Sequence, residues 1–215
     1  MKRPLVTVLL LTACSAPVED ERFVAAFRCE SDVVFDAWRG GDTLRIDFMN
    51  NEHILRAVAA DGVEHYRGEG MEAWLDDGTA LLLVGARRYE CHLDESVMQA
   101  IERGVDYRAI GQEPGWLLEV FADQSFELHY DYGAEVAKFP WVAPRTLDGA
   151  RKYAVESAGA QLEIDIAVAP CIDVMSGQPY PDTVTVRYRD ASLERELSGC
   201  GRPLPALDGS NTPFL

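Results

Sequence analysis

Basic residues are scarce in this sequence. Lysine and arginine together number 20 against 36 aspartate and glutamate residues, which gives a formal net charge of −16 at pH 7. This balance excludes nucleic acid as an expected partner, because the phosphate backbone would be repelled. A basic protein is the partner class that the charge favours, since opposite charge speeds encounter. The alternative is that the acidity serves solubility alone.

Long apolar runs are also scarce. The run over residues 5–11 is too short to span a bilayer, and no other run is long and apolar enough. It follows Lys2 and Arg3 and leads into Leu11-Thr12-Ala13-Cys14. A positive start, an apolar centre and a small-residue exit are typical of a secretory signal peptide. The last four residues resemble a bacterial lipobox, after which the cysteine becomes the acylated first residue.

We therefore predict a signal peptide over residues 1–13, lipid attachment at Cys14 and a polar tether over residues 14–22. Each buried CH₂ of an acyl chain contributes about 0.8 kcal/mol, so several chains anchor a protein firmly in a membrane. Ser15 stands where many inner-membrane lipoproteins have Asp, and therefore resembles an outer-membrane sorting signal. The expected location is the periplasmic face of the outer membrane. An ordinary signal peptide with a chance cysteine is the alternative.

Cysteines are few, and none has metal-ligand spacing. With Cys14 assigned to lipid, Cys29, Cys91, Cys171 and Cys200 remain. An even number in an oxidising compartment indicates two disulfides. Of three possible connectivities we favour Cys29–Cys91 and Cys171–Cys200, because each pair brackets a compact block of strands; free buried thiols are the alternative. The four histidines form no paired motif, so we expect no metal ion and no cofactor.

The chain is predicted to be mainly β. Apolar and polar residues alternate with the period of half-buried strands, and an uninterrupted apolar run indicates one fully buried strand. The alternation covers residues 44–48, 126–132, 162–168 and 184–188, and the apolar run covers residues 79–84. Strands separated by Gly, Pro and Asp turns favour antiparallel sheets closed into barrels or sandwiches.

Residues 94–106 change character and predict a short linking helix. Asp94 can cap this helix, Val97, Ala100 and Ile101 share one face, and Gly104 can end it. The helix would separate two antiparallel β modules. The predicted organisation is a small β-barrel over residues 23–93, the linker over 94–106, a second β module over 107–202 and a Pro-rich disordered tail over 203–215.

The first module carries a recognisable set of motifs. It opens with Phe27-Arg28-Cys29 and closes with Tyr89-Glu90-Cys91. Between them lie Ala59-Ala60-Asp61-Gly62, Tyr66, Trp74 and Asp77-Gly78-Thr79-Ala80-Leu81-Leu82. In this pattern, residues 27–93 resemble the membrane-bound inhibitors of c-type lysozyme. That family has an aromatic-x-Cys opening, a Ser-Gly-x-x-Tyr loop, a Trp-x-Lys-Gly-x-x-Ala-x-Leu strand and a closing Cys.

The resemblance implies a small antiparallel barrel pinned by Cys29–Cys91. It also implies a loop that enters the lysozyme cleft, where a Ser and a Lys of the inhibitor meet the two catalytic carboxyl groups. The contact candidates are Asp61, Gly62, His65, Tyr66, Asp76 and Asp77.

This chain departs from the family at the contact itself. The loop holds no Ser, and Asp76 occupies the Lys position. Acids there would repel the catalytic carboxylates of lysozyme, yet would attract its basic outer surface. Both modes of contact stay open.

The second module carries other motifs. They are Gly111-Gln112-Glu113-Pro114-Gly115-Trp116, Pro170-Cys171-Ile172-Asp173-Val174-Met175-Ser176-Gly177, Tyr180-Pro181 and Gly199-Cys200. Residues 107–202 thereby resemble a domain of uncharacterised bacterial envelope lipoproteins, whose relatives often carry the lysozyme-inhibitor module in the same chain. The relatives have Phe where this chain has Gly115.

A catalytic interpretation of the second module would pair Glu113 with Asp173, or use Ser176 as nucleophile with His129 as base. Neither Ser-x-x-Lys nor Gly-x-Ser-x-Gly surrounds Ser176. We expect Glu113 and Asp173 to hydrogen-bond turn backbone instead, and the chain not to be an enzyme.

The function expected from the sequence is binding and inhibition of c-type lysozyme or a similar basic cell-wall hydrolase. A structural or assembly role in the cell envelope, without inhibition, is the alternative.

Overall fold

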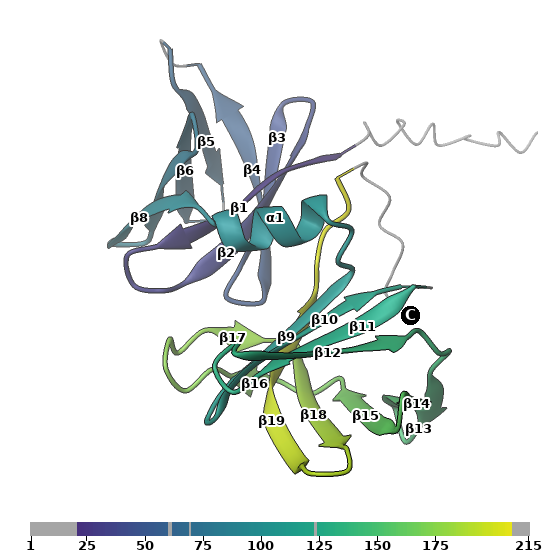
Figure 1. Ribbon diagram of the computed structural model, residues 1–215. Coiled ribbons are helices and arrows are strands. Elements are labelled where there is room, and N and C mark those ends of the chain that lie inside the picture. The colour runs from purple at the N-terminus through teal and green to yellow at the C-terminus, as the bar shows by residue number, and fades with distance from the viewer. Residues whose placement is uncertain (1–20, 60–61, 69, 123, 208–215) are drawn as a thin grey trace, which may run out of the picture.

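The computed structural model describes residues 21–59, 62–68, 70–122 and 124–207. These residues form two antiparallel β modules with one short helix between them, as Figure 1 shows. The mainly β fold predicted from the sequence is confirmed. The predicted signal peptide, Cys14 and Asp61 lie outside the described residues. Within those residues, no helix is long and apolar enough to cross a membrane.

The first module is a closed barrel in which the strands follow chain order. Its interior is built by alternation: Leu44, Ile46 and Phe48 are buried, whereas Arg45 and Asp47 point outward. The strands are β1 (Arg22–Cys29), β2 (Val34–Gly40), β3 (Thr43–Phe48), β4 (Asn51–Val58), β5 (Glu64–Gly68), β6 (Met71–Asp76), β7 (Thr79–Val84) and β8 (Arg87–Leu93).

The barrel closes where β1 pairs with β8. Cys29 and Cys91 face each other in this register and form a disulfide, as predicted. In the chain-entropy description, a crosslink over 62 residues contributes about 4 kcal/mol to stability. The bond therefore fixes the seam of the barrel.

The linker contains the predicted helix, α1 (Glu95–Glu102). The carboxylate of Asp94 accepts a hydrogen bond from the Val97 backbone N–H at 3.2 Å, which caps the helix. Gly104 follows with a φ of +81°, a conformation that favours glycine and ends the helix. The buried face packs on β1 and β2 in a cluster of apolar residues, which are Phe23, Ala26, Trp38, Val97, Ala100, Ile101, Val105 and Leu204.

The second module is a curved nine-stranded sheet in the order β12-β11-β10-β9-β19-β18-β15-β14-β13. A separate pair, β16 and β17, lies beside it. The strands are β9 (Tyr107–Gln112), β10 (Gly115–Phe121), β11 (Ser125–Tyr130), β12 (Glu135–Pro140), β13 (Arg145–Leu147), β14 (Ala150–Ser157), β15 (Ala160–Ala167), β16 (Cys171–Ile172), β17 (Pro179–Tyr180), β18 (Asp182–Arg189) and β19 (Glu194–Pro203).

The core of this module also comes from alternation. Leu162, Ile164 and Ile166 of β15 are fully buried with the apolar faces of the neighbouring strands. The predicted strands are slightly too long at their ends, because Tyr132 and Val168 fall just outside β11 and β15 and are exposed. The second predicted disulfide, Cys171–Cys200, joins β16 to β19.

The C-terminal end of the described chain belongs to the fold. Pro203 ends β19, although we predicted a disordered tail from this residue. Leu204 is buried against α1 and the barrel, and its backbone N–H bonds to the Asp106 carbonyl at 2.9 Å. The flanking prolines favour a disordered tail, but burial of the Leu204 side chain between the modules holds this segment in the fold. Residues 208–215 lie outside the described part. At the other end, β1 begins at Arg22, the last residue of the predicted tether.

Candidate functional site

One end of the barrel gathers the segments that the lysozyme-inhibitor resemblance singled out. Strand register places Glu64 of β5 opposite Leu75 of β6, and Asp76 opposite Thr79 of β7. The connection that contains Gly62 therefore lies beside the β6–β7 turn. The end of β4 and the start of β5 lie on the side of the barrel away from the second module (Figure 1).

Asp76 and Asp77 form the exposed tip of the β6–β7 turn. Asp77 and Gly78 both have positive φ, as a tight hairpin turn requires, and the Thr79 hydroxyl donates to the Asp76 carbonyl at 2.6 Å. Neither carboxylate makes an ion pair with a described residue. Other acids nearby are paired: Glu64 with Arg39, and Asp42 with Arg56. The turn therefore presents two uncompensated negative charges to solvent.

His65 lies on the outer face next to this tip. Its ring stacks on Trp74 with centroids 4.4 Å apart and planes 9° from parallel. Its Nε2 is 3.0 Å from Glu72, whose second partner is Arg67. The hydrogen bond from Arg67, followed by that from His65, lowers the pKa of Glu72. The stacked rings lie beside the acidic turn, and the side chain of His65 is only 11 % exposed.

Tyr66 does not belong to this outer surface. Its side chain packs inside the barrel with the core, and its hydroxyl donates to Glu64 at 3.3 Å. The period of two along β5 causes this, because His65 faces outward and the next residue must face inward. Tyr66 therefore shapes the barrel and is not available for contact, whereas Gly62, Asp76 and Asp77 are exposed.

The motifs of the second module converge on the loop between β16 and β17. Asp173 accepts hydrogen bonds from the Ser176 N–H at 2.9 Å and the Ser176 hydroxyl at 2.6 Å. It also accepts one from Gln112 at 3.1 Å, which joins the first motif to the second. Burial, the largest effect, would raise the pKa of Asp173, but these hydrogen bonds together lower it. Asp173 thus holds the turn, as expected from the sequence.

A catalytic arrangement is not formed around Ser176. Its hydroxyl donates to Asp173 and accepts from the Gln178 N–H at 3.2 Å, so it serves the turn. His129, the candidate base, lies on β11 beside Glu127 and is not a partner of Ser176. Glu113 is exposed at the β9–β10 turn and is not a partner of Asp173. Asp173, the carboxylate at the Ser176 hydroxyl, has a lowered pKa and is therefore a weak base.

A second cluster of polar groups joins β10 and β11. Glu119, Glu127 and His129 place ligand atoms within 4.8 Å of one another. Three cations pair with these carboxylates: Arg103 and Arg108 lie 2.5 Å and 3.3 Å from Glu119, and Lys138 lies 2.6 Å from Glu127. A metal ion would have to displace them, so the cluster is built as an ion-pair network.

The sequence did not single out the acids at the junction of the modules. Asp36 stands on β2 and Asp47 opposite it on β3, and Arg202 of β19 pairs with Asp36 across the junction. One signal was present: Asp36 interrupts the apolar residues 33–38. A buried acid in an apolar strand indicates a charged partner, but the identity of Arg202 depends on tertiary structure.

No protein-family model matches this chain, and no curated protein sequence matches it. The assignment of both modules to families is therefore a proposal.

Proposed function

We propose that this chain is a lipid-anchored outer-membrane protein that captures a basic cell-wall hydrolase at the acidic end of its barrel, with c-type lysozyme as the expected partner. One observation carries the proposal. The two segments that resemble the contact regions of lysozyme inhibitors lie side by side at one barrel end, and they expose Gly62, Asp76 and Asp77 there.

The charge at this end favours contact with the basic outer surface of the hydrolase. Two unit charges 4 Å apart interact by about 1 kcal/mol in water, and by more when the contact excludes water. Asp76 and Asp77 would meet repulsion of this size from the catalytic carboxylates, but attraction from surface lysine and arginine. The partly exposed Trp74 adds an aromatic contact beside them. Inhibition would follow from covering the hydrolase, without a cation in its cleft.

The experiment compares Asp76→Lys with Glu135→Lys in binding and inhibition assays against a c-type lysozyme. Glu135 is exposed on β12 of the second module and pairs with no described residue, so it is a matched charge reversal away from the barrel end. We expect Asp76→Lys to weaken binding about fivefold, the size of reversing one exposed charge contact. Glu135→Lys should change it little.

Stronger inhibition by Asp76→Lys would instead support insertion into the catalytic cleft. If neither the wild-type chain nor Asp76→Lys binds lysozyme at low salt, the proposed partner is wrong. A structural or assembly role in the envelope would then be the better account.

A further inference from the structure

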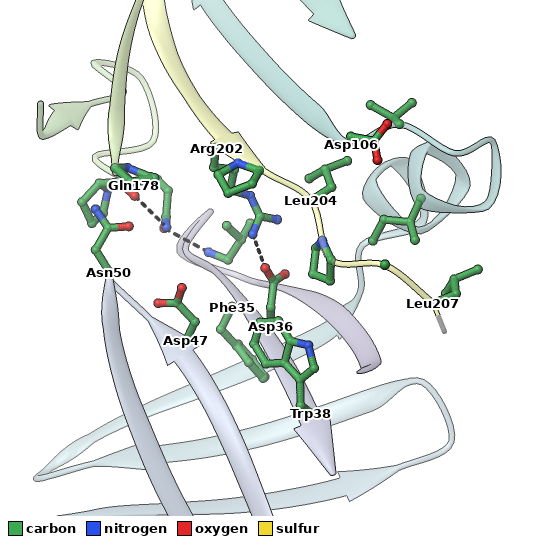
Figure 2. A pocket seen from close by; sticks show the side chains of 18 of the residues that line it. Phe35, Asp36, Trp38, Asp47, Asn50, Asp106, Gln178, Arg202, Leu204 and Leu207 are labelled. Atoms are coloured by element: carbon green, nitrogen blue, oxygen red, sulfur yellow. Dashed lines mark hydrogen bonds and ion pairs between the residues drawn. The ribbon is translucent and has the colours of Figure 1, made fainter. Parts of the chain in front are cut away.

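A cleft of about 850 Å³ lies between the barrel and the second module. Figure 2 shows its walls: β2 and β3 of the barrel on one side, and the end of β19 with the chain that follows it on the other. Its size falls within the range of pockets that enclose small molecules, and such pockets favour junctions between modules. The cleft is formed by other strands than the barrel end proposed above to bind the hydrolase.

The cleft carries more acid than base. Asp36 and Asp47 are direct cross-strand neighbours on β2 and β3, an arrangement that is unfavourable for like charges. Arg202 pairs with Asp36 and is the one basic residue among the described lining residues. Asp47 also lines the cleft, and its side chain is exposed. Desolvation, followed by the charge of Asp36, raises the pKa of Asp47. The charges of Arg202 and Arg45 act on this pKa in the opposite direction, and a ligand cation beside Asp47 would add to their effect.

Two polar atoms in the cleft have no hydrogen-bond partner among the described residues. They are Oδ1 of Asp36, whose side chain is 4 % exposed, and Nη2 of Arg202. The other polar group beside them is occupied, because Gln178 accepts from the Val34 N–H at 3.1 Å and donates to the Pro179 carbonyl at 3.2 Å. Both atoms are buried and closed to a ligand, so the carboxylate that the cleft offers to a ligand N–H is the exposed one of Asp47.

The remaining wall is mainly apolar. Figure 2 shows Leu204 and Leu207 on the side of the cleft opposite Asp47, with Trp38 below Asp36. Leu207 is 51 % exposed, so it offers surface that a ligand can cover. Four prolines add rigid apolar lining, namely Pro179, Pro181, Pro203 and Pro205. Asp106 also lines the cleft beside Leu204, where its carboxylate accepts from the Ala122 N–H at 2.7 Å. The cleft therefore has Asp36 and Asp47 on one side and a mainly apolar wall on the other.

We infer that this cleft is a binding site for a small cationic amphiphile, a molecule with a protonated amine and an apolar body. The amine pairs with the exposed carboxylate of Asp47. The apolar body covers Leu204 and Leu207. A ligand without the amine makes no ion pair with Asp47, and a carboxylate ligand is repelled by it.

The test uses n-hexylamine, n-hexanol and n-hexanoate as probes of equal chain length. Binding to the full chain is followed by the NMR signal of the Trp38 indole N–H, assigned with Trp38→Phe. We expect a saturable shift with n-hexylamine at about tenfold higher affinity than with the other two, the size of one charge-assisted hydrogen bond. Asp47→Asn should reduce the hexylamine affinity severalfold and leave hexanol unchanged.

Asp148→Asn is the matched control, because it removes one carboxylate from an exposed turn of the second module where a positive φ tolerates asparagine. Equal affinity for the three probes would overturn the inference, as would the absence of a saturable Trp38 shift. An equal loss of hexylamine affinity in Asp47→Asn and Asp148→Asn would also overturn it, because the effect would then be one of net charge. Each outcome is independent of binding to lysozyme.

Discussion

At the scale of single residues, glycines in the second module leave room for one tryptophan. A Cβ on Gly111 would lie 2.0 Å from Nε1 of Trp116, and a Cβ on Gly199 would lie 2.8 Å from the same ring. Trp116 uses the space to donate to the Ser198 carbonyl at 3.3 Å. The glycines of the two motifs are thus explained by close packing around one buried indole.

We expect Gly199→Ala to destabilise the protein by about 3 kcal/mol or more, because the new Cβ would also lie 2.0 Å from the Ile110 carbonyl oxygen, which is backbone and cannot move aside. Urea unfolding followed by circular dichroism measures this. Thr146→Ala on the exposed strand β13 is the control and should change stability by less than about 0.5 kcal/mol. Equal stability of the two variants would contradict the packing argument.

Gly115 shows what a motif alone could not predict. The resemblance has Phe at this position, and the departure had no explanation from the sequence. In the structure, a Cβ on Gly115 would lie 2.7 Å from the ring of Tyr132, and the Tyr132 N–H bonds to the Gly115 carbonyl at 2.9 Å. The ring of Tyr132, which follows β11, occupies the space that a side chain at position 115 would need. This contact depends on the pairing of β10 with β11, so a linear motif does not contain it.

At the scale of elements, strand alternation and capping predicted most of the fold. The helix ends predicted from Asp94 and Gly104 agree with the structure, because each residue acts on the backbone of the nearest helical turn. The order of the strands in the second sheet was not predictable in this way. β19 lies between β9 and β18, and this pairing joins residues about ninety positions apart. Inward-facing Tyr66 shows the same limit, because a motif match does not decide which face of a strand is buried.

The loop between β16 and β17 depends on the ionised form of Asp173. Its pKa is lowered in the folded protein, so the stabilisation is complete above the unfolded value of about 3.9 and is lost as pH falls through the folded value. Asp173→Asn should therefore cost about 1–3 kcal/mol near neutral pH. Its difference from wild type should narrow below about pH 4. Urea unfolding at several pH values measures both, and a difference that is constant down to pH 2 would contradict this role.

At the scale of the whole molecule, the two modules are joined by a buried ion pair and a side chain that reaches across. Arg202 of β19 pairs with Asp36 of β2, and Gln178 accepts from the Val34 N–H. The partners of the first contact are 166 residues apart. Composition and periodicity predicted two modules but not this junction, because nothing local marks which surface strand of the barrel meets the second module.

Arg202→Met should destabilise the protein by about 3 kcal/mol, because Asp36 remains as a buried charge without its partner. The double variant Asp36→Leu with Arg202→Met should lose less, since both charges are then gone. Urea unfolding of the two variants measures the difference. A double variant less stable than Arg202→Met alone would show that packing, and not the unpaired charge, decides the loss.

The central claim is that the acidic barrel end binds a basic hydrolase. Calorimetric titration of the full chain with a c-type lysozyme at about 0.01 M and about 0.15 M salt tests it most directly, because the screening length falls from about 30 Å to about 8 Å between them. We predict binding at the lower salt, an affinity about tenfold lower at the higher salt, and a smaller salt effect for Asp76→Lys. Absence of binding at low salt, or binding that salt and Asp76→Lys leave unchanged, would contradict the account.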